Sequence, residues 1–135
     1  MPFTSSYASY DSGTLSAGSS KTIVNLSGKG ELDKIQLRWL NVGTTSFWIK
    51  ITIDGEELLY LSGSGLIALC GDASPNISGG GAIIQLLHVD SGTNTYALSL
   101  KLNLRFNKTC KVEIENQGGS DMQYNILPIV HLWVR

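Results

Sequence analysis

The sequence predicts an all-β protein: a single antiparallel β-sandwich of about eight strands in a jelly-roll-like arrangement. Two stretches carry this prediction. Apolar side chains occupy alternate positions in residues 47–53, FWIKITI, and six times in succession in residues 96–106, YALSLKLNLRF. A period of two residues places one set of side chains on a core and the other on the opposite face of a sheet. Glycine-rich and asparagine-rich turns separate the strands, and a closed barrel is the alternative architecture.

The length and the composition set limits on domain number and partner class. A chain of 135 residues corresponds to one domain. Residues 1–20 are rich in Ser, Gly and Tyr and predict an N-terminal arm or a loose first strand, whereas residues 21–135 form the sandwich domain. The net charge is −1 and only 16% of residues are charged, without a Lys/Arg cluster. We therefore expect no nucleic-acid partner and no anionic membrane partner.

The N-terminus, MPFTSSYASY, has neither a basic segment nor an apolar run. It does not resemble a secretory signal, and no apolar stretch reaches the length of a membrane span. The expected strands, in chain order, are residues 21–27, 32–40, 47–53, 58–61, 82–89, 96–106, 110–115 and 124–135.

Two short turns predict β-hairpins. Asp54-Gly55 separates two apolar runs, and Asp-Gly favours a tight turn of the primed type because both residues tolerate positive φ. Asn107-Lys108 separates the long strand at 96–106 from residues 110–115. We expect these two hairpins to supply the two facing sheets.

Four stretches leave alternatives open. Residues 66–70 fit a short strand or one helical turn, and residues 82–89 fit a buried strand or part of a short helix. Residues 71–81, GDASPNISGGG, predict a long loop that is either functional or disordered, and this loop is the easiest place for a binding site. Pro128 indicates an edge strand, a bulge or a kink, because proline cannot donate to a sheet ladder.

We find no pattern typical of an active site, and we expect no enzyme activity, no metal and no cofactor. Asp54 is explained by its turn. Glu113 and Glu115 lie on one strand face that we expect to be solvated. The two histidines, His88 and His131, come with no recognisable nucleophile motif.

Two cysteines, Cys70 and Cys110, either form a disulfide or pack as two buried thiols. The second alternative is favoured because the chain shows no secretory signal. Together with the two histidines they lack the spacing of a zinc site.

Two tryptophans are candidates for interface or ligand contacts. Trp48 alternates with the apolar positions of its strand, so it should point away from the core, with Lys50 on the same face. Trp133 shares a face with His131 and Arg135. Outward tryptophans suit subunit interfaces or stacking on sugars. A shift in register would instead place both in the core.

The order of several motifs resembles that of small β-sandwich virion proteins of tailed phages, which include head decoration proteins, head-fibre proteins and tail-tip modules. The matching segments are residues 13–30 (GTLSAGSSKTIVNLSGKG), 32–37 (LDKIQL), 49–55 (IKITIDG) and 104–116 (LRFNKTCKVEIEN). These motifs are turns and alternating strands, so the resemblance brings no catalytic or metal residues.

The resemblance implies a non-enzymatic virion structural protein, foremost a capsid decoration or cement protein that acts by protein–protein assembly. Its implied partners are copies of itself, as a homotrimer, and other virion proteins such as the major capsid protein. The alternative is a carbohydrate- or receptor-binding module of a tail tip, with a glycan as ligand. A small β-sandwich hydrolase is a third hypothesis, and it would need a clustered acid/base site.

Overall fold

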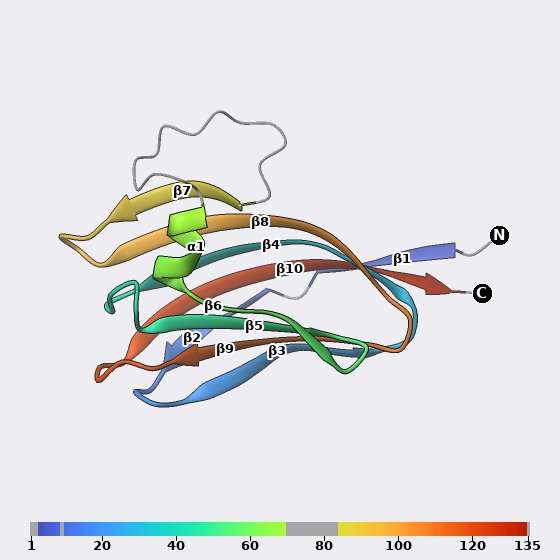
Figure 1. The fold of residues 1–135 in the computed structure, drawn as a ribbon, viewed down its shortest axis with the longest axis horizontal. Helices are drawn as coiled ribbons and strands as arrows, with labels where there is room; N and C mark the ends of the chain where they lie inside the picture. Colours follow the sequence, from blue (N-terminus) through green and yellow to red (C-terminus); the bar gives the residue numbers. More distant parts are fainter. Residues whose placement is uncertain (1–2, 9, 70–83, 135) are drawn as a thin grey trace.

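Two antiparallel sheets face each other across a shared core in the computed structural model, which describes residues 3–8, 10–69 and 84–134 (Figure 1). The described residues form ten strands and one short helix. The elements are β1 (Phe3–Ala8), β2 (Asp11–Leu15), β3 (Ser20–Ser27), β4 (Gly30–Leu40), β5 (Phe47–Ile53), β6 (Glu56–Ser62), α1 (Gly63–Leu69), β7 (Ile84–Asp90), β8 (Thr95–Phe106), β9 (Thr109–Asn116) and β10 (Met122–Val134).

The strand order is that of a jelly roll. One sheet has six strands in the order β1-β10-β4-β8-β7, with β2 also paired to β10, and the other has four in the order β3-β9-β5-β6. The chain changes sheet between β2 and β3, β3 and β4, β4 and β5, β6 and β7, β8 and β9, and β9 and β10. Strands β2, β10, β4 and β8 thus face β3, β9, β5 and β6, which is the double Greek-key arrangement. The predicted sandwich is confirmed, with ten strands instead of about eight.

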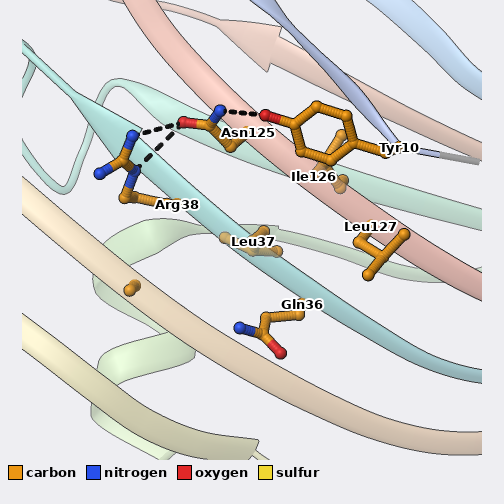
Figure 2. Close-up of a pocket in the computed structure, with 8 residues that line it drawn as sticks. Tyr10, Gln36, Leu37, Arg38, Asn125, Ile126 and Leu127 are labelled. Atoms are coloured by element: carbon orange, nitrogen blue, oxygen red, sulfur yellow. Dashed lines mark hydrogen bonds between the residues drawn. The ribbon is translucent and has the colours of Figure 1, made fainter.

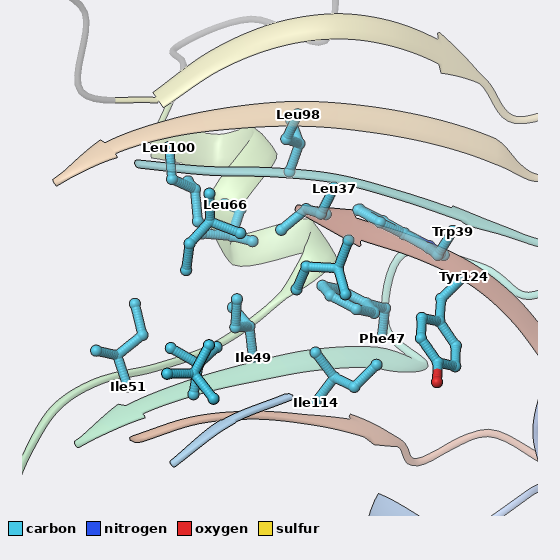
Figure 3. Close-up of a cluster of buried hydrophobic side chains, with 14 of the residues drawn as sticks. Leu37, Trp39, Phe47, Ile49, Ile51, Leu66, Leu98, Leu100, Ile114 and Tyr124 are labelled. Atoms are coloured by element: carbon cyan, nitrogen blue, oxygen red, sulfur yellow. The ribbon is translucent and has the colours of Figure 1, made fainter. Parts of the chain in front are cut away.

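The core lies between the sheets and follows the predicted alternation. In β5 every second residue is buried, from Phe47 to Ile53, and these side chains face Leu37, Trp39 and Leu98 of the six-stranded sheet (Figure 3). Trp39 stacks on Phe47 with 4.4 Å between ring centroids. Burial of these large side chains is the main stabilising contribution to such a fold.

The β5–β6 hairpin is confirmed, whereas the predicted hairpin of β8 and β9 is wrong. Asp54 and Gly55 have φ angles of 52° and 84°, as a primed turn requires. Strand β8 pairs with β4 and β7, but β9 pairs with β3 and β5 in the opposite sheet. Local alternation shows that both strands have one core face. It does not show whether those faces lie side by side or opposite each other, and here they are opposite.

Asp54 joins the two turns. Its carboxylate accepts hydrogen bonds from the backbone N–H groups of Asn107, Lys108 and Thr109, at 2.6–3.0 Å. These bonds, that from Asn107 foremost, lower the pKa of Asp54 below its ordinary value of 3.8. Asp54 is therefore more than a turn residue, because it holds the β5–β6 turn against the β8–β9 connection.

Replacing Asp54 by Asn should lower the melting temperature at neutral pH, because a neutral amide is a weaker acceptor than a carboxylate. A depressed folded-state pKa contributes stability above 3.8, and this contribution is lost as pH falls through the folded value. The difference between wild type and Asp54→Asn should therefore shrink on acidification, as followed by thermal melts at a series of pH values. Asp121→Asn, at another exposed aspartate, is the control for the loss of a surface carboxylate. A difference that stayed constant at all pH values would contradict this role.

The ambiguous stretches are now assigned. Residues 63–69 form α1, so the helical alternative is right there, and residues 84–90 form strand β7. Pro128 lies between the part of β10 that pairs with β2 and the part that pairs with β1, next to a register shift at Ile129/Val130. Proline has no backbone N–H, and Pro128 lies where the pairing of β10 changes from β2 to β1. The predicted binding loop at 71–81 lies outside the described residues.

Cys110 is a free thiol buried in the core. Burial, with a smaller contribution from Asp54, raises its pKa to about 11. It packs as a small apolar side chain, whereas Cys70 lies outside the described residues.

Candidate functional site: the outer faces of the two sheets

Within the described ranges, no three His, Cys, Asp or Glu side chains come together as metal ligands. His131 contacts Asp33 at 3.3 Å, and both lie on the six-stranded sheet. The features that remain as candidate sites are the outer faces of the two sheets, which differ strongly in chemistry.

The outer face of the four-stranded sheet carries an aromatic cluster, which we define as Trp48, Lys50, Tyr60, Glu115 and Gln117. Trp48 and Lys50 come from β5, Tyr60 from β6 and Glu115 from β9, while Gln117 directly follows β9. Cross-strand pairing sets Lys50 beside Tyr60 and Trp48 beside Glu115. Because β5 is the middle strand of these three, its outward side chains have neighbours on both sides.

The contacts in the aromatic cluster are specific. The Trp48 and Tyr60 rings lie 5.0 Å apart at an angle of 51°, and the Trp48 indole N–H donates to the Thr45 carbonyl at 3.1 Å. The Tyr60 hydroxyl donates to Glu115 Oε1 at 2.6 Å, and Gln117 Nε2 donates to the same oxygen at 2.8 Å. The bond to the Glu115 carboxylate raises the pKa of Tyr60.

Lys50 completes the cluster. Its ammonium lies 5.6 Å from the centroid of the Tyr60 ring and 3.7 Å from Glu57 Oε1. The predicted outward position of Trp48 and Lys50 therefore agrees with the structure. Tyr60 was missed because residues 58–61, LLYL, show no alternation in the sequence: Leu58 is apolar but exposed, next to a register shift at Ile51/Thr52. Glu115, which we expected on a merely solvated face, is the acceptor at the centre of the cluster.

The outer face of the six-stranded sheet carries a polar chain across a shallow hollow (Figure 2). Arg38 donates to Asn125 Oδ1 from Nε at 3.1 Å and from Nη2 at 2.8 Å, and Asn125 donates to the Tyr10 hydroxyl at 2.6 Å. The hollow encloses about 320 Å³. Its lining comprises Tyr10, Gln36, Leu37, Arg38, Ala97, Asn125, Ile126 and Leu127.

A second hollow of about 270 Å³ continues along the same face over β2, β4 and β10, and shares Arg38 and Asn125 with the first. Neither Arg38 nor Asn125 was predicted as a site residue. The signal was the alternation of β4 and β10, which places Arg38 and Asn125 on outward positions of two adjacent strands.

Trp133 lies apart from the aromatic cluster, on β10 of the six-stranded sheet. It is half-buried, and the Arg105 guanidinium lies 5.0 Å from the centroid of its ring. Its backbone N–H donates to the Lys29 carbonyl at 2.9 Å. The structure thus brings Trp48 and Lys50 together and places Trp133 on the other sheet.

No known protein family and no curated protein matches the sequence. Among solved structures, the chain is similar to one of infectious bursal disease virus, Gt strain, with 12% identity over 99% of this chain and a TM-score of 0.48. It is also similar to the VP2 subviral particle of that virus, with 14% identity over 99% of this chain and a TM-score of 0.45. The catalytic domain of a GH87 α-1,3-glucanase follows with 13% identity over 92% and a TM-score of 0.36.

The chain spans 33% of each of the two viral chains and 22% of the glucanase chain. Similarity at these identities and TM-scores says nothing about function. Within the residues that the structure describes, no helix is long and apolar enough to cross a membrane. The jelly roll itself is established by the strand order of this chain.

Proposed function

We propose that this protein is a non-enzymatic virion structural protein, a capsid decoration or cement protein that acts by protein–protein assembly. Its partners in this proposal are copies of itself, as a homotrimer, and other virion proteins such as the major capsid protein. The observation that carries the proposal is the composition of the outer face of the six-stranded sheet. The order of turn and strand motifs supports it, as does the use of jelly rolls in viral capsids, by analogy of fold.

The middle of that outer face is nearly uncharged. Lys34, Ile129 and Lys101 form the next cross-strand row and lie beyond this middle part. The outward positions of the middle part, on the neighbouring strands β10, β4 and β8, are Gln36, Arg38, Leu40, Thr95, Ala97, Ser99, Gln123, Asn125 and Leu127. Arg38 is the single charge among them, and two bonds to Asn125 hold its guanidinium in place. Protein interfaces are depleted in charged residues at their centre but enriched in arginine and aromatic residues. Arg38, Leu127 and Tyr10 therefore fit the centre of a subunit contact.

The opposite outer face is unlike it. On the four-stranded sheet, four charged side chains, Lys50, Lys111, Glu113 and Glu115, lie on outward positions of two neighbouring strands. Lys111 and Glu113 pair at 3.6 Å. Burying these ions in an interface would require their desolvation. The difference between the two faces favours subunit contacts through the six-stranded sheet, with the four-stranded sheet turned outward.

A cyclic trimer built on this face is expected to dissociate when a charge enters its centre. Leu127→Glu should convert a trimer into monomers, because burying a carboxylate at the contact would require its desolvation. Sedimentation equilibrium measures the mass directly, and circular dichroism verifies that the variant is folded. Thr52→Glu, on the outer face of the four-stranded sheet, is the matched control and should stay trimeric. Wild-type protein that is monomeric at all concentrations and fails to co-sediment with capsids would overturn the proposal.

A further inference from the structure

We propose that the aromatic cluster on the four-stranded sheet is a binding site for a neutral hexose unit of a glycan, with the sugar ring stacked on Trp48. The site goes beyond the role in assembly, because it lies on the other sheet and uses none of the residues of the six-stranded face. Three features of the cluster support this site: the aromatic surface, the hydrogen-bond acceptors and the local charge.

The aromatic surface is rigid and partly exposed. Trp48 stands on β5, which is paired on both sides, and its indole N–H is bound to the Thr45 carbonyl. Tyr60 is 37% exposed, Trp48 is half-buried, and the two rings meet at an angle of 51° on the outer face of the sheet. A pyranose ring has an apolar face of C–H groups. The hydrogens of these groups are weakly positive, so this face packs on the negative face of an aromatic ring. A ring that is already fixed loses little conformational entropy on binding.

The acceptors sit beside this surface. Tyr60 and Gln117 both donate to one oxygen of the Glu115 carboxylate, Oε1. No donor from the described residues bonds to its other oxygen, Oε2, so that oxygen is available to a sugar hydroxyl. A hydroxyl-to-carboxylate bond is shorter and stronger than a bond between neutral groups. The donors on Oε1 orient the carboxylate before the ligand arrives.

The local charge selects the kind of sugar. The Lys50 ammonium lies near Glu57, at 3.7 Å, which leaves the Glu115 carboxylate without a paired cation within the described residues. A like charge close to a carboxylate is unfavourable. Uronic and sialic acids would place a second carboxylate near Glu115, so the site should favour neutral hexoses.

In a trimer that assembles through the six-stranded sheet, this cluster would face outward in three copies. Three weak sites on one particle bind a polymer more tightly than each site binds a single sugar. This gain rests on the proposed trimer, whereas binding at the single site does not. The monomeric variant Leu127→Glu separates binding at the single site from the gain due to three sites. It should bind a short oligosaccharide as tightly as the wild type does, but it should bind the polymer more weakly.

The test is binding of the full chain to immobilised neutral glucan, galactan and mannan and to one acidic polysaccharide, alginate, followed by titration with oligosaccharides of the glycan that binds. We expect at least one neutral polymer to bind and alginate to bind less. Trp48→Ala should weaken binding by about tenfold or more, as truncation of an aromatic contact at a hot spot does. Glu115→Gln, which removes the charge and keeps the shape, should weaken it by a smaller factor.

Two controls keep the result interpretable. Trp133→Ala removes a tryptophan from the other sheet and should leave binding unchanged. Trp48→Phe keeps an aromatic ring and should retain part of the affinity, which separates loss of stacking from loss of folding. Wild-type protein that binds none of the four polymers, binding that survives Trp48→Ala, or a preference for alginate would each overturn the proposal, whatever the oligomeric state.

Discussion

Gly30→Ala should lower the free energy of unfolding by roughly 3 kcal/mol or more, the upper range for overpacking in a core. Gly30 begins β4 and lies between Phe106 of β8 and Leu132 of β10. A Cβ atom at this position would overlap the backbone carbonyl oxygen of His131 and lie 2.9 Å from the Phe106 ring. A ring can turn aside, but a carbonyl of a paired strand cannot move without breaking its ladder. The β4–β10 pairing would therefore have to open at this end.

The matched control for Gly30→Ala is Gly13→Ala. Gly13 is also in a strand paired to β10, but a Cβ there would meet only the Tyr124 side chain, at 3.5 Å, which is ordinary contact. Chemical denaturation followed by circular dichroism compares the two variants. Equal stability of Gly30→Ala and Gly13→Ala would show that the close approach of β4 to β10 does not exclude a side chain at position 30.

The second large effect is expected at Asn116, the buried polar side chain at the end of β9. Its Nδ2 donates to the carbonyls of Leu15 at 2.9 Å and Ser120 at 2.7 Å, and its Oδ1 accepts from the Gly118 N–H at 3.0 Å. Asn116 is fully buried, so water cannot replace these bonds. Asn116→Ala removes three hydrogen bonds and should lower the free energy of unfolding by about 3 kcal/mol.

An aspartate at position 116 should make the stability depend on pH. In Asn116→Asp the carboxylate would face two carbonyl oxygens, whereas the protonated acid can donate to one of them. The folded state would then favour the neutral form and raise the pKa of the new side chain. Stability should be highest at acidic pH and fall as pH rises through the raised folded value.

Chemical denaturation of the wild type, Asn116→Ala and Asn116→Asp at acidic and neutral pH tests these roles of the Asn116 side chain. Asn25→Ala, at an exposed position of β3, is the control and should change stability by less than about 0.5 kcal/mol. An Asn116→Asp variant that is equally stable at both pH values would argue against the bonding pattern.

Asn116 and one ion pair join the two sheets at places that local patterns do not reveal. The Lys21 ammonium lies 2.9 Å from Asp11 Oδ2 and donates to the Tyr124 hydroxyl at 3.0 Å. Lys21 belongs to the four-stranded sheet, while Asp11 and Tyr124 belong to the other. The hydrogen bond to Tyr124 and the contact with Asp11 raise the pKa of Lys21, so the pair remains charged across the physiological range.

Only part of the aromatic cluster could be predicted from the sequence. The alternation in β5 placed Trp48 and Lys50 on the outward face, because each residue's side depends on the strand period alone. Tyr60 could not be placed in this way, since the bulge opposite Ile51 and Thr52 changes which residues of β6 point outward. Glu115 was visible as an outward residue, but its bonds to Tyr60 and Gln117 depend on three segments meeting at one point.

The sequence by itself determined the fold class, the β5–β6 turn and the core face of the main strands, because these follow from local spacing and from the positive φ of Asp54 and Gly55. Only the tertiary structure decided that β8 and β9 lie in opposite sheets, that β1 and β2 share β10, and that the two outer faces differ in chemistry. A strand carries its period in its sequence, but its partner is chosen by long-range hydrogen bonding and by how the facing side chains fill the core.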